Sequence, residues 1–391
     1  MEQKLVALSG NEAVAYAFKQ AKPHVAAAFP ITPQTEMMHK YAEFVANGQS
    51  STEMILVESE HSAMSAAVGS AAAGARTFTA TSSAGFALMW EIVYIAASLR
   101  LPICMALVNR ALSGNINIHC DHSDSMGGRD AGWIHLFSEN AQESYDNAIM
   151  SWRIAEHMDV RLPVMVNYDG FIISHTADSL YMLPDDEAYK FIGKYKANYS
   201  LLDVENPITV GPLDLTDYYF EHKVSQLEAY PRALEVIKQV SKEYGDLTGR
   251  YYDFAEEYMM DDAEMVMVVL GSSAGTCKDV IDEYREKGVK VGLLKLRTFR
   301  PFPVAYIAEK LAGRKAVCVL DRSASFGGQG GPVFMEVRSA MYGLQVPVHG
   351  YIYGLGGRDF DLKQAATVID NLKKVAAGNE MAEINLLGVR S

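Results

Sequence analysis

The chain has 391 residues, of which 49% are hydrophobic and 21% are charged, and its formal net charge is −13 at pH 7. This length is too great for one ordinary hydrophobic core, so we expect two domains. The acidic balance, with no run of basic residues, argues against nucleic acid or a membrane surface as a partner, because both need clustered Lys and Arg. No apolar stretch approaches the length of a membrane span, and the first residues do not resemble a signal peptide.

Four cysteines lie scattered along the chain without a C-x-x-C pair. This usage favours a reducing, cytoplasmic location. It also argues against an iron–sulfur cluster or a structural zinc ion held by this chain alone. We therefore expect any cluster that the function requires to lie on another subunit.

The first half of the chain alternates short apolar runs with helical patterns. Helices are predicted at 34–45 and 60–75, the second built mostly from small residues. Strands that are apolar throughout and alternate with helices predict a parallel sheet with helices on both faces. The predicted strands lie at 25–29, 54–57, 77–81, 102–108 and 163–167.

A second α/β series begins after residue 260, where helices follow the segments GSSAGT, RPFP and FGGQGG. The predicted fold class is therefore α/β with two domains. We place the larger domain, with an extended tail, at 1–235, a linker at 236–260 and the smaller domain at 261–391. The polar, tyrosine-rich passage at 175–260 shows no pattern that assigns its elements. The predicted strands of the second series lie at 264–270, 289–296, 316–321 and 346–353.

Ligands of open parallel sheets bind at the carboxyl ends of strands, so the loops that follow strands are the candidate sites. In FPITP, two prolines fix the backbone around Thr32, although a rigid turn capped by Thr32 explains the same residues. In VESEH, Glu58 and Glu60 stand where a strand ends and a helix begins. A helix N-terminus favours an acidic residue by itself, whereas the small residues that follow leave room for a flat ligand.

A third loop begins with Arg110, whose guanidinium could receive a carboxylate through two hydrogen bonds. The loop also concentrates His, Cys and Asp residues over His119–Asp124, which would suit a metal-dependent hydrolase. Their spacing matches no familiar zinc or iron pattern. We therefore favour a hydrogen-bonded loop that shapes the pocket, and we predict no metal ligand in this chain.

Taken together, the three loops resemble those of the α, or pyrimidine-binding, subunit of 2-oxoacid:ferredoxin (acceptor) oxidoreductases, of which the pyruvate enzyme is best known. The resemblance rests on FPITP, VESEHSA and NRALS-x-x-INI, and continues through DH-x-DSM, RD-x-GW and YDGF-x-x-SH. Later it includes LLKLRTFRPFP, VLDRS-x-SFG, GGP and GLGGRD, so it covers nearly the whole chain in order. It implies a thiamine-diphosphate pyrimidine-binding domain followed by a transketolase C-terminal-like domain.

The resemblance also implies an activity and its residues. The activity is the oxidative decarboxylation of a 2-oxoacid to an acyl-coenzyme A and CO2. Glu60 matches the glutamate that bonds to the pyrimidine ring, Thr32 would bond to the 2-oxoacid, and Arg110 would hold its carboxylate. Further residues are expected to line the cofactor or the substrate. These are Pro30, Ile31 and Ser83 for the cofactor, and Asn115 for the substrate.

The chain lacks the GDG motif that holds Mg²⁺ and the diphosphate in thiamine enzymes. The resemblance therefore implies that a small β-type subunit supplies this half of the site. Further partners would be a ferredoxin-like subunit with [4Fe-4S] clusters and a γ-type subunit, in a hetero-oligomer of anaerobic metabolism. The final acceptor would be ferredoxin, or NAD reached through a flavin subunit.

One departure from the family pattern affects the expected substrate. Gly114-Asn115 replaces Ala-Pro, and INIH replaces INIW, which loosens the loop beside Arg110. Pyruvate is our first choice, and an aromatic 2-oxoacid such as phenylglyoxylate is the alternative. A nicotinamide dehydrogenase would need a G-x-G-x-x-G turn, which is missing. A non-catalytic scaffold would predict eroded loops, yet Thr32, Glu60 and Arg110 are all present.

Overall fold

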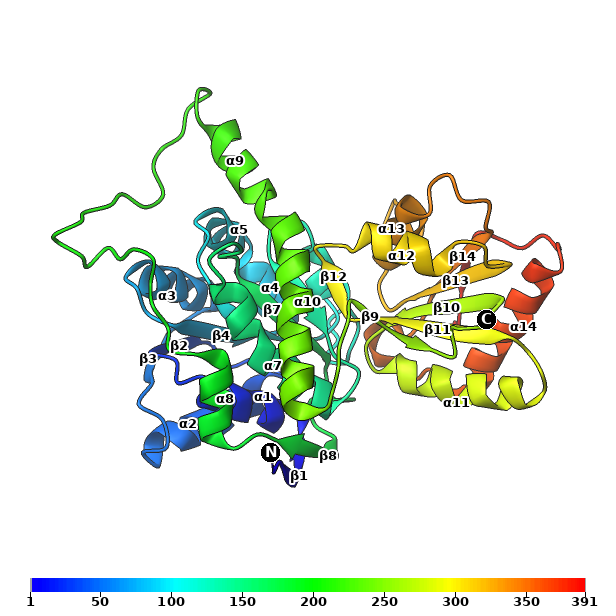
Figure 1. Cartoon of the computed structure of the whole chain (residues 1–391), viewed down its shortest axis with the longest axis horizontal. Coiled ribbons are helices and arrows are strands. Elements are labelled where there is room, and N and C mark those ends of the chain that lie inside the picture. Colours follow the sequence, from blue (N-terminus) through cyan, green and yellow to red (C-terminus); the bar gives the residue numbers. More distant parts are fainter. Residues whose placement is uncertain (1, 391) are drawn as a thin grey trace.

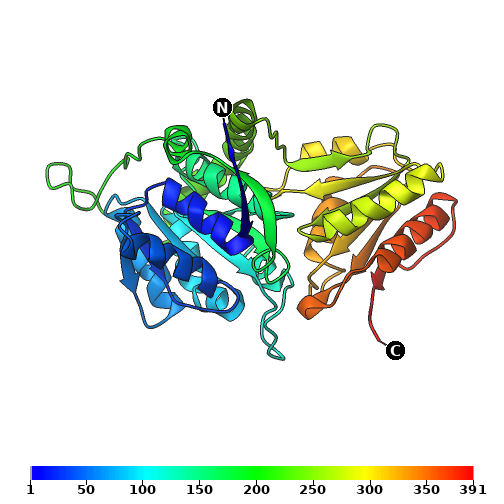
Figure 2. The ribbon, with the colours of Figure 1, turned by 90° about the horizontal axis from the view of Figure 1, so that it is seen from below.

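Residues 2–390, which the computed structural model describes, form two sheets that lie side by side, together with a two-stranded ribbon (Figures 1 and 2). The first sheet has seven strands in the order β12-β6-β7-β5-β4-β2-β3, all parallel except β12, which runs antiparallel to β6. Its strands are β2 (Val25–Ala28), β3 (Glu53–Leu56), β4 (Thr77–Thr81), β5 (Cys104–Asn109), β6 (Ile134–Phe137), β7 (Val164–Asp169) and β12 (Thr298–Arg300).

Helices cover both faces of this sheet, as its sequence predicts. Along β5, Ala106 packs into the core shared with α1, α2 and α7, whereas Met105 and Leu107 pack into the core beneath α3 and α5. Successive side chains of a strand point to opposite faces, so a strand buried on both faces is apolar throughout. The helices are α1 (Gly10–Gln20), α2 (Thr35–Ala46), α3 (Glu60–Ala72), α4 (Ser83–Leu88), α5 (Trp90–Ser98), α6 (Ser123–Gly127) and α7 (Ala141–Glu156).

The second sheet has six strands in the order β15-β14-β13-β10-β11-β9, of which β9 alone runs antiparallel to its neighbour. Its two faces are again covered by helices. The strands are β9 (Ala255–Tyr258), β10 (Met265–Leu270), β11 (Val291–Leu296), β13 (Ala316–Asp321), β14 (Val348–Ile352) and β15 (Ile384–Leu386). The helices are α11 (Ser273–Glu286), α12 (Val304–Leu311), α13 (Pro332–Ala340) and α14 (Leu362–Ala376), with the short 3-10 turn η1 (Leu355–Gly357).

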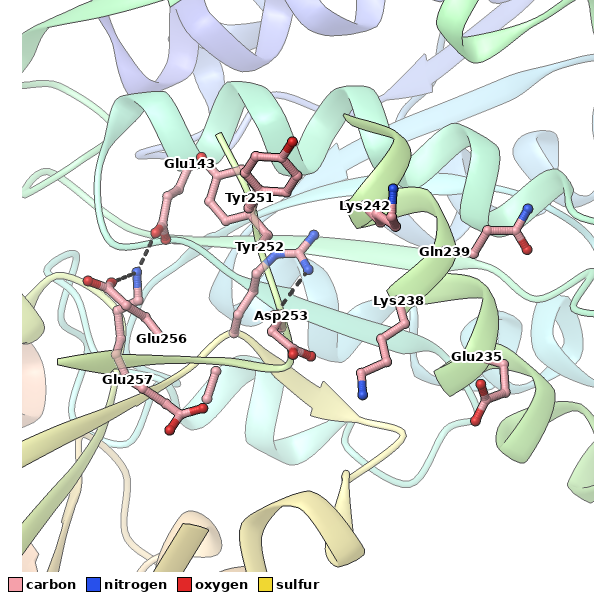
Figure 3. Close-up of a pocket in the computed structure, with 13 residues that line it drawn as sticks. Glu143, Glu235, Lys238, Gln239, Lys242, Tyr251, Tyr252, Asp253, Glu256 and Glu257 are labelled. Atoms are coloured by element: carbon pink, nitrogen blue, oxygen red, sulfur yellow. Dashed lines mark hydrogen bonds and ion pairs between the residues drawn. The ribbon is translucent and has the colours of Figure 1, made fainter. Parts of the chain in front are cut away.

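The two sheets are connected by a strand pair and by a cluster of side-chain ion pairs around Lys295. After β11 the chain returns to the first sheet, where β12 pairs with β6. Lys295 of β11, which is 3% exposed, lies 2.9 Å from Glu139 and 2.8 Å from Glu256, and also pairs with Glu143. Glu143 and Glu256, labelled in Figure 3, line a cavity of about 880 Å³ beside α10 (Ala229–Thr248) together with Lys295. The domain limits at 1–235, 236–260 and 261–391 stay a prediction.

The passage that sequence patterns left unassigned contains both packed and projecting elements. Strand β8 (Ala177–Met182) pairs with β1 (Lys4–Ser9), and α8 (Asp185–Ile192) follows it. Residues 193–218 form a long loop that first bonds to the end of α3, through Ser200 and Leu201, and then leads into α9 (Tyr219–Leu227), which has no buried residue (Figure 1). No helix among the described residues is long and apolar enough to cross a membrane.

Candidate active site

The first sheet has a topological switch point between β2 and β4. The chain runs from β2 to the edge strand β3 and then crosses back to β4 on the other side of β2. Loops that leave such neighbouring strands diverge and open a crevice at their carboxyl ends. The FPITP loop follows β2 and the Ser82-Ser83 turn follows β4, so the topology brings the predicted FPITP loop beside the predicted residue Ser83.

Glu60 is the first residue of α3 and only 7% of it is exposed. The preceding Ser59 caps the helix by accepting a hydrogen bond from the amide of Ser62 at 3.2 Å. A Cβ atom added at Gly85 would lie 2.6 Å from Oε1 of Glu60 and 2.6 Å from Oγ1 of Thr81. The Glu60 carboxylate therefore lies directly against the start of α4, at a place where only a glycine fits.

Two groups at this point lack a hydrogen-bond partner. Within residues 2–390, the buried hydroxyl of Thr81 has no hydrogen-bond partner, and the Glu60 carboxylate beside it forms no hydrogen bond. A buried hydroxyl without a partner is costly, so the site is suited to a ligand that brings N–H donors to these two groups. The pyrimidine ring of thiamine diphosphate is flat and carries such donors, so these residues fit it. By contrast, Glu58 is exposed and accepts a bond from the hydroxyl of Ser62, which lowers its pKa.

Arg110 follows β5 and is joined to the FPITP loop. Its Nη1 donates to the carbonyl of Thr32 at 2.7 Å, and its Nε donates to the carbonyl of Asn117 at 2.9 Å. No partner is found for Nη2 in the part of the chain that is described. Burial lowers the pKa of Arg110, which the Asp124 carboxylate opposes. Thr32 and Arg110 thus meet, with the Thr32 hydroxyl and one guanidinium nitrogen left for a ligand.

Asp124, from the DH-x-DSM motif, connects these loops from beneath. One of its oxygens accepts from the amides of Ser83 and Arg110 at 3.0 and 2.9 Å. The other accepts from the side chain of Asn109 at 3.0 Å and from the amide of Ser125 at 2.7 Å. Burial raises the pKa of Asp124 to about 6. The sequence placed Asp124 in a hydrogen-bonded loop that shapes the pocket, but it did not identify which loops Asp124 joins, because its partners are distant in the chain.

The remaining predicted site residues are distributed unevenly. Ser83 has a positive φ of 47°, and its hydroxyl donates to the carbonyl of Ala111 at 2.5 Å, so that hydroxyl already has an acceptor. Pro30 is exposed and Ile31 is partly buried beside the crevice. Asn115 stands on an exposed part of the Arg110 loop and forms no hydrogen bond with the other predicted residues.

A buried cluster at the junction of the two sheets was also missed. Asp169, at the end of β7, lies 2.8 Å from Nε2 of His122 and 2.9 Å from Nη1 of Arg322, and it accepts from the hydroxyl and amide of Ser272. Burial opposes ionisation, yet His122 and Arg322 hold the pKa of Asp169 well below its usual range. Cys120, His122 and Asp169 could in geometry share a metal ion, but Arg322 already supplies a cation there.

Residues 16–242 match the family described as "Pyruvate flavodoxin/ferredoxin oxidoreductase, thiamine diP-bdg". Residues 263–365 match "Pyruvate:ferredoxin oxidoreductase core domain II". The chain is 59% identical over 356 residues to the pyruvate synthase subunit PorA of Thermotoga maritima, covering 90% of this chain and 91% of the relative. It is 43% identical over 377 residues to the ketoisovalerate oxidoreductase subunit VorA of Pyrococcus abyssi, covering 96% and 95%.

Two solved structures share the fold. One is a 2-oxoglutarate:ferredoxin oxidoreductase from Magnetococcus marinus, with a TM-score of 0.71 and 20% identity over 95% of this chain. This chain spans 65% of that chain, slightly less than two thirds of its length. The other is a split gene transketolase with a TM-score of 0.56 and 12% identity, covering 95% of this chain and 99% of the other.

These findings confirm the predicted fold class, with a thiamine-diphosphate-binding domain and a transketolase-like C-terminal domain. They also confirm the resemblance that FPITP, VESEHSA and the later motifs indicated. The relatives are enzyme subunits, so the activity belongs to an assembly that includes this chain. The chain belongs to the family of pyruvate flavodoxin/ferredoxin oxidoreductases, the 2-oxoacid:ferredoxin oxidoreductases, as a thiamine-diphosphate-binding subunit.

Proposed function

We propose that this chain supplies the pyrimidine half of the site in a complex that oxidatively decarboxylates pyruvate with coenzyme A. The observation that carries the proposal is the buried Glu60 carboxylate, which lies against Gly85 and accepts no hydrogen bond within residues 2–390. Pyruvate is supported by relatives named pyruvate synthase subunits at 59% and 46% identity. Relatives named ketoisovalerate oxidoreductase subunits, at 43% identity, make a branched 2-oxoacid a necessary member of any substrate panel.

Thiamine diphosphate, when bound, supplies the carbon nucleophile and the electron sink that decarboxylation requires. In our proposal, Glu60 accepts a hydrogen bond from the pyrimidine ring and holds a proton there. Gly85 leaves the space for this contact, and the crevice walls near Pro30, Ile31 and Ser83 surround the ring.

The substrate would lie on the other side of the crevice. There the hydroxyl of Thr32 can donate to the 2-oxoacid, and Nη2 of Arg110 can donate to its carboxylate. Asp124 keeps the Arg110 backbone in place through its 2.9 Å hydrogen bond. Asn115 stays a proposed substrate contact, which would require the exposed loop around it to close.

We further propose that a partner subunit completes the site with Mg²⁺ and the diphosphate group, and that [4Fe-4S] clusters lie on other subunits. The chain has no GDG element of its own. Near the Glu60 site, Leu56, Leu88 and Trp90 are 87%, 51% and 42% exposed. Apolar side chains gathered on one surface are typical of protein–protein contacts, and the projecting segment with α9 adds more of them.

The acceptor and the finer substrate choice also belong to this proposal. Ferredoxin is the acceptor we favour, and NAD reached through a flavin subunit is the alternative. The aromatic alternative, phenylglyoxylate, is supported by Gly114, which adopts a φ of 135° in an exposed loop with open space around it. A non-catalytic scaffold is disfavoured, because Thr32, Glu60 and Arg110 are all retained in loops that follow strands of the first sheet, and Arg110 bonds to Thr32.

The test is an anaerobic assay of the assembled complex with coenzyme A, a viologen dye and a panel of straight, branched and aromatic 2-oxoacids. Wild type is compared with Glu60→Gln, and Glu58→Gln serves as the matched control because Glu58 is exposed. We expect activity with pyruvate that falls by about 10²- to 10⁴-fold in Glu60→Gln and is retained in the control. A wild-type complex inactive on every 2-oxoacid would refute the proposed function. Full activity in Glu60→Gln would refute the role of Glu60.

A further inference from the structure

The FPITP loop is held at three successive carbonyl groups. The carbonyl of Ile31 accepts hydrogen bonds from two amides that follow it in the chain, at 2.8 and 3.1 Å. The carbonyl of Thr32 accepts from Nη1 of Arg110 at 2.7 Å. The third carbonyl, that of Pro33, accepts from Nδ2 of Asn11 at 2.9 Å. Asn11 is the second residue of α1, so this helix reaches the loop from the core behind it.

The side-chain amide of Asn11 is buried and bonded at both of its ends. Its Oδ1 accepts from the hydroxyl of Tyr168, on β7, at 3.0 Å, and both residues are 0% exposed. A backbone carbonyl can only accept, so the amide nitrogen must face Pro33 and the amide oxygen must face Tyr168. The two bonds therefore fix the amide in one orientation.

The backbone of Asn11 is fixed by the turn that carries the YDGF-x-x-SH motif. Its amide donates to the carbonyl of Ser174 at 3.1 Å. In the same turn, a Cβ atom added at Gly170 would lie 2.8 Å from the ring of Pro33, so the turn also packs directly against the loop. The start of α1, the end of β7 and this turn thus form one base beneath Pro33.

The bond from Asn11 contributes direction more than net stability. Hydrogen bonds formed on folding replace bonds to water, so their net contribution is small, whereas each one fixes the distance and angle between its partners. Thr32 is exposed and the adjacent Pro33 is buried. Asn11 therefore holds the buried side of the loop while Thr32 stays accessible to a ligand.

We propose that Asn11 is a positioning residue for 2-oxoacid binding, which acts through the Pro33 carbonyl to place the hydroxyl of Thr32. The inference rests on the proposed function, in which Thr32 donates to the 2-oxoacid. Loss of the bond should misplace a binding group and leave the reacting atoms of the cofactor as they are. The expected signature is a higher KM for the 2-oxoacid with little change in kcat.

The other end of α1 offers a matched control. Gln20 is 1% exposed, its Nε2 donates to the carbonyl of Leu183 at 2.9 Å, and its Oε1 accepts from the buried hydroxyl of Tyr145 at 2.6 Å. It repeats the bonds of Asn11, to a backbone carbonyl on one side and a tyrosine on the other, without contact with the FPITP loop. Its Nε2 also donates to Asp185, so a carboxylate at this position should cost at least as much stability.

The test is steady-state kinetics of the assembled complex, with pyruvate varied at saturating coenzyme A and thiamine diphosphate. Asn11→Asp keeps the size of the side chain and the acceptor for Tyr168, but turns an oxygen toward the Pro33 carbonyl. We expect its KM to rise about tenfold and its kcat to stay within about twofold of wild type. Gln20→Glu should keep the wild-type KM even though urea unfolding shows it to be less stable.

Two further comparisons show whether Asn11 acts through Thr32. In a Thr32→Val background, Asn11→Asp should raise KM by less than about twofold, because the group that it positions is already absent. If Asn11→Asp does not assemble, Tyr168→Phe removes the hydroxyl that orients the amide and should raise KM about threefold, whereas Tyr145→Phe should not.

Three results would overturn the proposal. These are a wild-type KM in assembled Asn11→Asp, or in Tyr168→Phe where that variant replaces it, an equal rise in KM in the matched variant at Gln20 or Tyr145, and a full effect of Asn11→Asp in the Thr32→Val background. A wild-type complex that is inactive on every 2-oxoacid would instead refute the proposed function, and this inference with it.

Discussion

Replacing Asp124 with asparagine should change the free energy of unfolding only slightly but should disturb the position of Arg110. The Asp124 carboxylate accepts four hydrogen bonds, and an asparagine can accept them only at its one oxygen. Two bonds to a charged acceptor are therefore lost, at roughly 1.5–3 kcal/mol each. Against this, burial disfavours the charge that asparagine lacks, since it raises the pKa of Asp124 to about 6 from 3.8 in spite of these hydrogen bonds.

These two effects nearly offset each other, so Asp124→Asn should lower the free energy of unfolding by only about 0–3 kcal/mol. The geometric effect has no such compensation. The amide of Arg110 loses its anchor, and displacement of a substrate-binding group by about 1 Å can cost on the order of 10²-fold in rate. We expect kcat/KM for the 2-oxoacid to fall by roughly 10- to 100-fold, mainly through a higher KM.

The assay combines urea unfolding of the full chain with steady-state kinetics of the assembled complex. Asp130→Asn is the control, since Asp130 is 69% exposed and makes surface ion pairs with Arg300 at 3.4 Å and with Arg129 at 3.9 Å. Wild-type kinetics in a folded Asp124→Asn complex would refute the view that this carboxylate positions Arg110. A stability loss far above the expected range would show that burial costs less than its raised pKa implies.

Three other changes test the structure in different places. Gly85→Ala should weaken thiamine diphosphate binding in calorimetry, because the added Cβ would lie 2.6 Å from the Glu60 carboxylate. Gly69→Ala is the control: Gly69 lies in α3, the helix that begins with Glu60, and its added Cβ would have no neighbour within 4 Å, so this variant should bind the cofactor normally. Asp321→Asn should weaken the pH dependence of the free energy of unfolding. Burial raises the pKa of Asp321 to about 7 in the folded state, from 3.8, so the folded state binds this proton more tightly than the unfolded state does. The free energy of unfolding of the wild type therefore falls as the pH rises from about 4 to 7. Urea unfolding between pH 4 and 7 would therefore show a shallower decline in the variant. Lys295→Met removes the cation that pairs with the buried Glu143 carboxylate, whereas Glu139 and Glu256 keep their ion pairs with Lys278, and should cost about 3–5 kcal/mol in the same assay.

The strands were predictable because burial on both faces leaves an apolar signature. Residues 77–81 and 316–321 are strands over the whole predicted ranges, and other predicted strands differ by a few residues at their ends. The three-residue strand β12 was missed, since its partner β6 lies more than 150 residues earlier. Helix α9 could not be found from amphipathic burial, because it buries none of its residues.

A candidate site could be proposed from the sequence only where chemistry is concentrated in one short motif. Glu60, Thr32 and Arg110 each follow an apolar strand, so their loops could be selected from local sequence. The role of Asp124 depends on amides 41 and 14 positions away, and that of Asp169 on side chains 47, 103 and 153 positions away. Local patterns carry no information about such partners, which only the parallel stacking of strand ends brings together.

The loop that begins at Arg110 forms hydrogen bonds with both domains. Within the loop, the carbonyl of Asn117 accepts a hydrogen bond from Nε of Arg110 at 2.9 Å. The side-chain amide of Asn117 donates to the carbonyl of Gly356, in the second domain, at 2.9 Å. Further along, Asp121 accepts from the amide of Gly356 at 3.0 Å, and His122 bonds to Asp169 at the base of the loop. A loop that contains Gly114 and exposed isoleucines would otherwise be free to move. In our proposal, the second sheet therefore supports substrate binding indirectly, because it fixes the loop that presents the guanidinium of Arg110.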